Sequence, residues 1–279
     1  MDREKLYELV KRSPELVDRH DREGWLGLFF SEAVVEDPVG GGLNRKGKDW
    51  HGDRDGLSRF YDIFIGPNDI KFTVNQDIVT DSEVVRDVLI YTRLPNGAVS
   101  EVAAYLIYRG VEEGGEIKLA GLQAHWDFKG NAMGLLRNNG MKGVVASIGQ
   151  FWSMLRIQGL KRVVQYMGAA YKGIRKKGMA VVNSFAAAVN ASDEAALARL
   201  CEPDARIEFP IGRKMPASDF LKGVGKGVHL EVSGLRSAGW YTSCAFDAQR
   251  GGAQRHGVAF FQFSPKSKKI ISARFFGEG

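Results

Sequence analysis

Two adjacent carboxylates, Glu36 and Asp37, stand in the stretch SEAVVEDPVGGG (31–42), where an apolar run turns into a half-buried strand before Pro38. Proline fixes its own backbone and restricts the residue before it, so the position of Asp37 is well defined. A carboxylate held in apolar surroundings is suited to moving protons. The alternative is that Asp-Pro ends a connection between a helix and a strand, and that the Asp37 side chain caps a local N–H group.

The chain repeats this phrase as PDARIEFPIG (203–212), with Phe209 in place of Asp37. A constant offset of 172 aligns Pro38 with Pro210 and also pairs Leu28 with Leu200, Ala33 with Ala205, Val35 with Ile207, Glu36 with Glu208 and Gly40 with Gly212. An unpaired carboxylate in an apolar interior is costly or becomes protonated. A copy with no use for the charge is therefore expected to lose it, which favours a function for Asp37.

His125 lies two residues before Asp127 in the stretch LQAHWDF, which has the pattern of a strand. Residues two apart share one face of a strand, so the two side chains are expected on the same side. An imidazole there could serve as a second base or as a hydrogen-bond donor. The alternative is a histidine whose polar atoms are satisfied by the next strand or by solvent.

The length and composition of the chain narrow the class of protein that positions these residues. A chain of 279 residues with 44% hydrophobic and 26% charged residues is typical of a soluble globular protein with one large or two ordinary domains. The first residues lack the apolar core of a secretory signal, and no uninterrupted apolar stretch of about 18 residues occurs. Cys201 and Cys244 fit buried thiols in a reducing compartment and lack metal-site spacing. We expect a cytoplasmic protein without a metal or a cofactor.

The apolar periodicity predicts the same order of elements twice. Residues 2–12 form a helix, Ser13-Pro14 caps and opens a new turn, and 21–30 and 56–65 form helices around a Gly- and Lys-rich loop (40–53). Strands follow at 69–79, 83–94, 98–109 and 117–128. The second half has helices within 180–201 and 216–224, a short strand in 205–212, and strands at 228–235, 240–249, 254–263 and 268–276. Helices followed by a run of antiparallel strands predict an α+β fold with one curved sheet in each copy.

The segment between the copies is basic and apolar at once. No acidic residue lies between Asp127 and Asp193, and ten Lys or Arg fall there, which leaves 29 basic and 33 acidic residues elsewhere. Apolar residues at helical spacing predict two amphipathic helices on either side of Gly159. Three interpretations are open: peripheral membrane contact through residues 142–177, nucleic-acid binding (not expected, because no known motif accompanies the charge), or a strut whose apolar face packs on one or both domains.

Three stretches carry a family resemblance: GWLGLFFSEAVVEDPVG, LSRFYDIF in the third helix, and LAGLQAHW in the last strand of the first copy. Together they resemble the SnoaL-like, nuclear transport factor 2-like superfamily, and within it the ketosteroid isomerase branch. The resemblance covers about residues 1–128 well and 180–276 more weakly. It implies two tandem cone-shaped domains, each with helices packed on a strongly curved antiparallel sheet, joined by a basic helical connector. The expected boundaries are 1–130, 131–179 and 180–279.

The resemblance also implies roles for particular residues. Asp37 occupies the position of the base, and Tyr61 matches a tyrosine that supports the family's oxyanion tyrosine. That oxyanion tyrosine itself falls on Ser13, and the position of the protonated acid falls within 102–111, which holds no carboxylate. Tyr105 is the candidate donor there, and His125 is a further candidate.

The pocket wall is expected to include Trp25, Phe60 and Trp126. The second copy carries Phe185 and Phe209 at the tyrosine and base positions, so it is expected to be catalytically empty. Two functions remain: proton-transfer isomerisation of a hydrophobic, steroid-like carbonyl compound in the first domain, or non-catalytic carriage of an apolar ligand, with or without a membrane surface. The expected partner is a small hydrophobic ligand. For assembly three arrangements are open: a homodimer, an intramolecular pseudo-dimer of the two copies, or copies that the connector holds apart.

Overall fold

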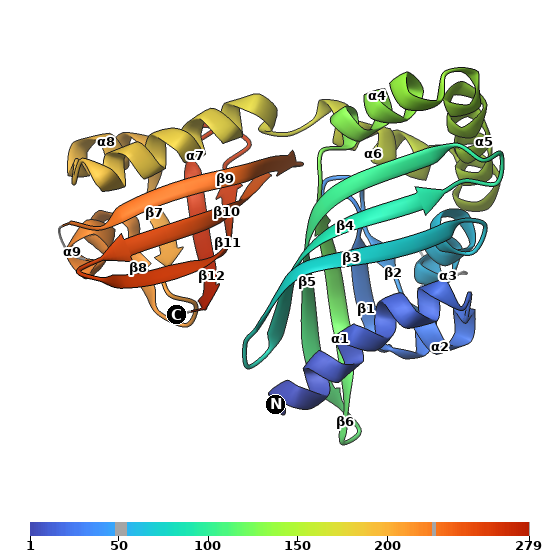
Figure 1. The fold of residues 1–279 in the computed structure, drawn as a ribbon, viewed down its shortest axis with the longest axis horizontal. Helices are drawn as coiled ribbons and strands as arrows, with labels where there is room; N and C mark the ends of the chain where they lie inside the picture. Colours follow the sequence, from blue (N-terminus) through green and yellow to red (C-terminus); the bar gives the residue numbers. More distant parts are fainter. Residues whose placement is uncertain (48–54, 225–226, 279) are drawn as a thin grey trace. The chain divides into compact units, whose positions relative to one another are not determined.

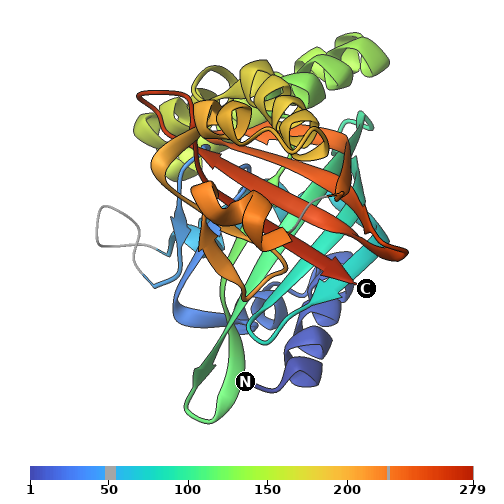
Figure 2. The same ribbon diagram turned by 90° about the vertical axis from the view of Figure 1, so that its left-hand side faces the viewer.

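The computed structural model describes residues 1–47, 55–224 and 227–278 and divides into two compact units, Met1–Tyr171 and Lys172–Gly279 (Figures 1 and 2). The helical segment predicted as a connector (131–179) is divided between the two units. Its part up to Tyr171 belongs to the first unit, because those helices pack on the first domain. Part of the predicted loop 40–53 lies outside the described residues.

The first unit is a mixed sheet with helices on its concave side and at its mouth. The helices are α1 (Arg3–Asp18), α2 (Arg22–Gly27), α3 (Gly56–Phe60), which continues as a π-helical turn (Tyr61–Ile65), α4 (Phe128–Asn139), α5 (Met141–Gln158) and α6 (Leu160–Tyr171). The strands are β1 (Phe29–Glu36), β2 (Asn44–Arg45), β3 (Asp69–Val79), β4 (Glu83–Arg93), β5 (Val99–Glu113) and β6 (Glu116–His125). Their order is β2-β1-β6-β5-β4-β3. The pair β1–β6 is parallel and the others are antiparallel, so the prediction of a purely antiparallel sheet is wrong at this pair.

Strand alternation decides which side chains face the helices. On β5, Ala104, Leu106 and Tyr108 belong to the core of the cone, whereas the residues between them point to the other face. Irregularities in the ladders, at Val74/Gln76 and at Arg109/Gly110, are places where a strand bends and twists more strongly. The sheet therefore curves around the apolar residues of α1, α2 and α3.

Helix α1 is continuous, although a break was predicted at Ser13-Pro14. It begins at the cap residue Asp2, whose carboxylate accepts the backbone N–H groups of Glu4 and Lys5 at 3.0 and 3.2 Å. Pro14 lies inside the helix. The apolar inner face of α1, with Leu6 and Val10 fully buried, holds the helix together across the proline. Ser13 is consequently buried and faces inward, which a capping residue would not do.

The second unit repeats the topology of the first. Its helices are α7 (Arg175–Asn190), α8 (Glu194–Leu200) and α9 (Phe220–Val224), with a 3-10 turn at Ala217–Asp219. Its strands are β7 (Cys201–Glu208), β8 (Lys214–Pro216), β9 (His229–Ala238), β10 (Tyr241–Arg250), β11 (Ala253–Phe263) and β12 (Ile270–Glu278), in the order β8-β7-β12-β11-β10-β9. The pair β7–β12 is parallel, as β1–β6 is. The predicted tandem of two α+β cones is confirmed.

The glutamate common to both copies has a structural role. The Glu208 carboxylate accepts the backbone N–H of Gly212 at 2.7 Å and the Arg274 guanidinium at 3.1 Å. Glu36 accepts the N–H of Gly40 at 2.9 Å in the same way. Each glutamate therefore closes the loop that follows its strand.

Replacing Glu208 with alanine is expected to lower the free energy of unfolding of the second domain by about 1–3 kcal/mol, because two hydrogen bonds to a buried carboxylate are lost. Urea denaturation followed by circular dichroism measures the change. Glu231→Ala is the matched control: its carboxylate pairs with His229 at the surface, and such pairs contribute about 0–1 kcal/mol. Equal losses in the two variants would contradict the role given to Glu208.

Candidate functional site

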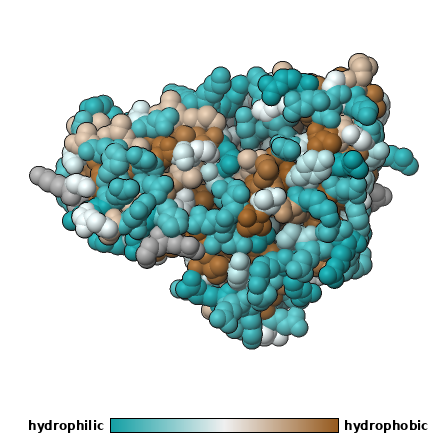
Figure 3. All heavy atoms as spheres, viewed as in Figure 1, coloured by the Kyte–Doolittle hydropathy of each residue, from teal (hydrophilic) through white to brown (hydrophobic). Residues whose placement is uncertain are grey.

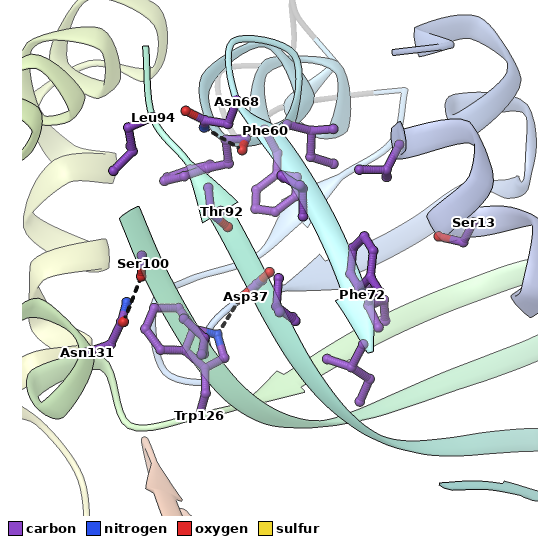
Figure 4. A pocket seen from close by; sticks show the side chains of 18 of the residues that line it. Ser13, Asp37, Phe60, Asn68, Phe72, Thr92, Leu94, Ser100, Trp126 and Asn131 are labelled. Atoms are coloured by element: carbon purple, nitrogen blue, oxygen red, sulfur yellow. Dashed lines mark hydrogen bonds between the residues drawn. The ribbon is translucent and has the colours of Figure 1, made fainter. Parts of the chain in front are cut away.

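A cavity of about 190 Å³ lies within the first unit, between the concave face of the sheet and the helices (Figure 4). Helices α1 and α2, the α3 segment, strands β3 to β6 and helices α4 to α6 all contribute residues to its lining. The lining is mostly apolar and includes Val17, Ile65, Ile70, Phe72, Ile90, Leu94, Val102, Leu106, Leu122 and Leu135. An apolar cavity with a few polar groups is the general form of a small-molecule site.

Asp37 lines this cavity directly after β1, where alternation turns Glu36 outward and Asp37 inward. Glu36 accepts a hydrogen bond from Gln123 on the outer face at 3.2 Å. The indole Nε1 of Trp126 donates to Asp37 Oδ1 at 2.6 Å (Figure 4). Burial raises the pKa of Asp37 to about 6, against the opposing effect of this hydrogen bond. The carboxylate is therefore poised near neutral pH.

The three predicted pocket residues, Trp25, Phe60 and Trp126, all line the cavity. Aromatic rings continue between them as one wall. Ring centroids lie 5.7 Å apart for Trp126 and Phe128, 5.1 Å for Phe128 and Tyr166, 5.2 Å for Tyr166 and Phe64, and 5.1 Å for Phe64 and Phe60. Such a wall offers a ligand a large rigid apolar surface.

Two hydroxyl groups lie where the family resemblance places the oxyanion tyrosine. Ser13 on α1 accepts the Nε1 proton of Trp25 at 3.2 Å and is hydrogen-bonded to the hydroxyl of Tyr108 on β5. Both Ser13 and Tyr108 line the cavity and are almost fully buried. The short serine side chain thus leaves Tyr108 as the phenol at this end of the cavity.

A buried ion pair packs against the ring of Tyr108. The Arg86 guanidinium lies 5.8 Å from the Tyr108 ring centroid and donates to both carboxylate oxygens of Asp77, at 2.7 and 2.8 Å. Burial raises the pKa of Tyr108, and the Arg86 charge and the Ser13 hydrogen bond act in the opposite direction. Tyr108 therefore stays protonated at neutral pH and can donate its hydroxyl proton in a hydrogen bond.

Helices α4 to α6 bring further polar groups to the other end of the cavity. The Ser100 hydroxyl donates to Asn131 Oδ1 at 2.9 Å, and Figure 4 shows this pair well away from Ser13, with Asp37 between the two ends. Gln150 and Tyr166 also line the cavity. Burial raises the pKa of Tyr166, and the nearby Asp37 charge adds to this effect. The cavity is thus elongated, polar at both ends and apolar along its walls.

Tyr61 is not among the described residues that line the cavity. It begins the π-helical turn and packs in the core against Trp25, with ring centroids 5.6 Å apart. Its hydroxyl is buried and has no hydrogen-bond partner among the described residues. The structure therefore places Tyr61 behind Trp25, as a packing residue.

Tyr105 and His125 lie on the other face of the sheet from the cavity. The two residues are directly paired across β5 and β6. Their neighbours in the chain, Leu106 and Trp126, line the cavity, so Tyr105 and His125 point to the opposite face. Burial lowers the pKa of His125 to about 3, so its imidazole is neutral. The geometry does not bring either side chain to Asp37, contrary to the expected arrangement.

In the second unit, aromatic rings fill the corresponding interior. Phe209 packs against Phe275 at 5.2 Å and Phe220 at 5.9 Å between ring centroids. Phe185, at the position equivalent to Ser13, lies 5.2 Å from Phe261. The polar groups of the first site have no counterpart at these positions.

No family model and no curated protein matches the chain. Among solved structures it is similar to the Δ5-3-ketosteroid isomerase from Mycobacterium sp., with 31% identity over 43% of this chain and 91% of that chain and a TM-score of 0.36. It is also similar to RV0760c from Mycobacterium tuberculosis in complex with estradiol-17β-hemisuccinate, with 24% identity over 44% and 93% of the two chains and a TM-score of 0.38. A third is SalBIII, an epoxide hydrolase/cyclase-like enzyme of salinomycin pyran ring formation, with 17% identity over 46% and 94% and a TM-score of 0.39.

Both units have six strands in one order, with a single parallel pair and helices on the concave face of the curved sheet. The first unit also has an aspartate, followed by a proline, that enters the cone directly after β1. The chain therefore consists of two tandem α+β domains of one topology, and the solved structures to which it is similar include a ketosteroid isomerase.

Proposed function

We propose that the first domain binds an elongated apolar carbonyl compound, of steroid-like shape, and isomerises it by proton transfer through Asp37. The observation that carries this proposal is the Asp37 carboxylate itself, which lies in an apolar cavity with a pKa of about 6. A base whose pKa lies near the working pH combines a useful ionised fraction with useful basicity. The steroid-like class comes from the sequence resemblance and suits the length and apolar walls of the cavity.

The arrangement gives each group a place in the reaction. The substrate carbonyl lies at the Ser13–Tyr108 end, within reach of the Tyr108 hydroxyl, and the rest of the molecule runs along the aromatic wall. Asp37 removes a proton from the carbon next to the carbonyl, and the electrons of that C–H bond form the dienolate. Tyr108 donates a hydrogen bond to the dienolate oxygen. Asp37 then returns the proton two bonds further along, so the double bond moves and no co-reactant is consumed.

A carrier function is the second candidate, and one observation favours it. Ser13 stands where the family resemblance implies an oxyanion tyrosine, and its oxygen already accepts the Trp25 N–H at 3.2 Å. Loss of one oxyanion donor typically costs about 10²–10³ in rate. A site with too few donors would bind an apolar ligand without converting it.

The experiment that tests the proposal is the formation of conjugated enone from a β,γ-unsaturated 3-ketosteroid, followed by ultraviolet absorbance across a pH series. The base acts when ionised, so kcat/KM should rise with pH and level off above about 6, the pKa of Asp37. A profile that is flat between pH 4 and 8, taken here as roughly two units on either side of that pKa, would contradict the role of Asp37. No turnover, together with steroid binding by tryptophan fluorescence, would favour the carrier.

A further inference from the structure

Helix α5 presents its large apolar side chains to solvent. Met141, Val144, Val145, Ile148, Phe151 and Trp152 recur at helical spacing along one stripe, and all of them are exposed, Met141 to 74% and Trp152 to 60%. The face of α5 that packs on the domain carries Gly143, Ala146, Met154 and Gln158, so most of the large apolar side chains of this helix lie on its exposed side. An ordinary surface helix has the reverse arrangement.

Helix α6, which packs against α5, also has exposed apolar side chains. Leu160, Val164, Met167 and Tyr171 form a second exposed stripe at helical spacing, with Leu160 exposed to 65% and Tyr171 to 69%. In Figure 3, hydrophobic side chains come to the surface at the upper right, where Figure 1 places α4 and α5. The stripes of α5 and α6 are here called the α5–α6 face. The strut interpretation holds for another part of these helices, since Met154 and Val163 are buried against Ile63 of the first domain, whereas the residues of the α5–α6 face are exposed.

The charge around the α5–α6 face has one sign. Lys142, Arg156 and Lys161 are exposed on the same two helices, and residues 128–192 contain no Asp or Glu. An exposed apolar stripe whose own helices carry cations and no carboxylate, with aromatic side chains among them, matches the boundary between the headgroups and acyl chains of an anionic bilayer. A protein partner would need a complementary acidic and apolar surface of its own.

We propose that the α5–α6 face docks the protein on the surface of an anionic lipid bilayer. No helix in the described part of the chain is long and apolar enough to cross a membrane. The two helices would therefore lie in the plane of the interface, with Phe151 and Trp152 inserted among the headgroups and Lys142, Arg156 and Lys161 on the phosphates.

Docking in this way would connect the bilayer with the cavity. The helices whose outer sides form the face also line the cavity on their inner sides, through Gln150 on α5 and Tyr166 on α6. An apolar ligand dissolved in the bilayer would meet the covering helices of the site directly. The docking proposal itself rests on the exposed stripes and the charges, and it stands whether the site is catalytic or a carrier.

Co-sedimentation of the full chain with vesicles tests the proposal. We expect binding to phosphatidylserine/phosphatidylcholine vesicles, at least about tenfold weaker binding to phosphatidylcholine alone, and weakening by salt. The double substitution Ile148→Ser with Trp152→Ser should lower binding about tenfold or more, since it removes apolar contact area. Val74→Ser is the matched control, because Val74 is exposed and apolar but lies on β3, and it should bind as the wild type does.

Two outcomes would overturn the proposal. One is failure of the full chain to bind anionic vesicles at low salt. The other is a wild-type protein that is larger than a monomer by light scattering, while the Ile148→Ser, Trp152→Ser variant is a monomer. That result would make the face an interface between copies of the chain. Circular dichroism of each variant shows whether it is folded, and Lys142→Gln with Lys161→Gln gives a second measurement. That pair should lose the preference for anionic lipid while keeping its fold.

Discussion

Replacing Asp37 with asparagine should lower the turnover of a β,γ-unsaturated 3-ketosteroid by about 10³- to 10⁴-fold, at the upper end of what one general base contributes. Asparagine keeps the shape of the side chain and can still accept the Trp126 N–H, which Asp37 accepts at 2.6 Å. The cavity is therefore unchanged in volume and still binds the steroid. What is lost is the only group in the proposed reaction that carries the proton.

The stability of the same variant provides a separate check. Burial raises the folded-state pKa of Asp37 to about 6, above its ordinary value of 3.8. Between these values the folded chain holds a proton that the unfolded chain has released, so this group's contribution to stability falls as pH rises and is at its lowest above about 6. The asparagine side chain has no charge to bury, so near pH 8, about two units above that pKa, the Asp37→Asn variant should be as stable as the wild type or more stable by about 1–3 kcal/mol. Urea denaturation of both proteins at that pH measures the difference.

Glu36→Gln is the matched control for this experiment. Its carboxylate is adjacent in sequence but points to the outer face, where it accepts the Gly40 N–H and the Gln123 amide. The substitution should leave turnover within a few-fold of the wild type. Similar losses in Glu36→Gln and Asp37→Asn, or full turnover in Asp37→Asn, would show that Asp37 is not the base.

The inward position of Asp37 could be predicted because a local pattern determines it. The apolar residues Ala33 and Val35 mark the buried face of β1, and a residue two further along continues that face. The phrase is repeated in the second copy, so the glutamate common to both could be separated from the aspartate found in one. Local alternation, the internal repeat and the family resemblance together pointed to Asp37.

The inward position of Tyr108 could not be predicted in the same way. Tyr105 and Tyr108 both lie in VAAYLIYRGV, and an odd spacing of three puts them on opposite faces. Which face is the inner one depends on the pairing of β5 with β6, which has an irregularity at Arg109/Gly110. A one-residue slip exchanges the faces. The buried neighbour Leu106 was the available signal for Tyr108.

Long-range packing also explains the two places where the observed helices differ from the predicted ones. Ser13-Pro14 has the local pattern of a helix start, yet the buried face of α1 carries the helix through it. The periodicity of α5 and α6 predicted amphipathic helices but could not say which side meets the protein. Most of the large apolar residues of α5 face solvent, while Gln150 and Tyr166 lie on the side that meets the domain, and this is why they were missed as cavity residues.

Replacing Tyr108 with phenylalanine should lower kcat for the same steroid by about 10²–10³-fold, with a much smaller change in KM, because an oxyanion donor acts mainly in the transition state. The ring remains over Arg86 and the core packing is kept, so only the hydroxyl is removed. Steady-state kinetics by ultraviolet absorbance measures both constants.

Two further variants make this prediction specific to Tyr108. Tyr105→Phe removes a phenol hydroxyl three residues away, on the opposite face of β5, and should keep kcat within a few-fold of the wild type. Ser13→Ala removes the hydroxyl that is hydrogen-bonded to Tyr108, so its effect should be smaller than that of Tyr108→Phe. If Ser13→Ala were the more damaging of the two, the serine would be the donor and Tyr108 its support. If neither changed kcat, charge on the carbonyl oxygen would be stabilised elsewhere, and Tyr166, whose phenol lies near Asp37, would be the next residue to replace.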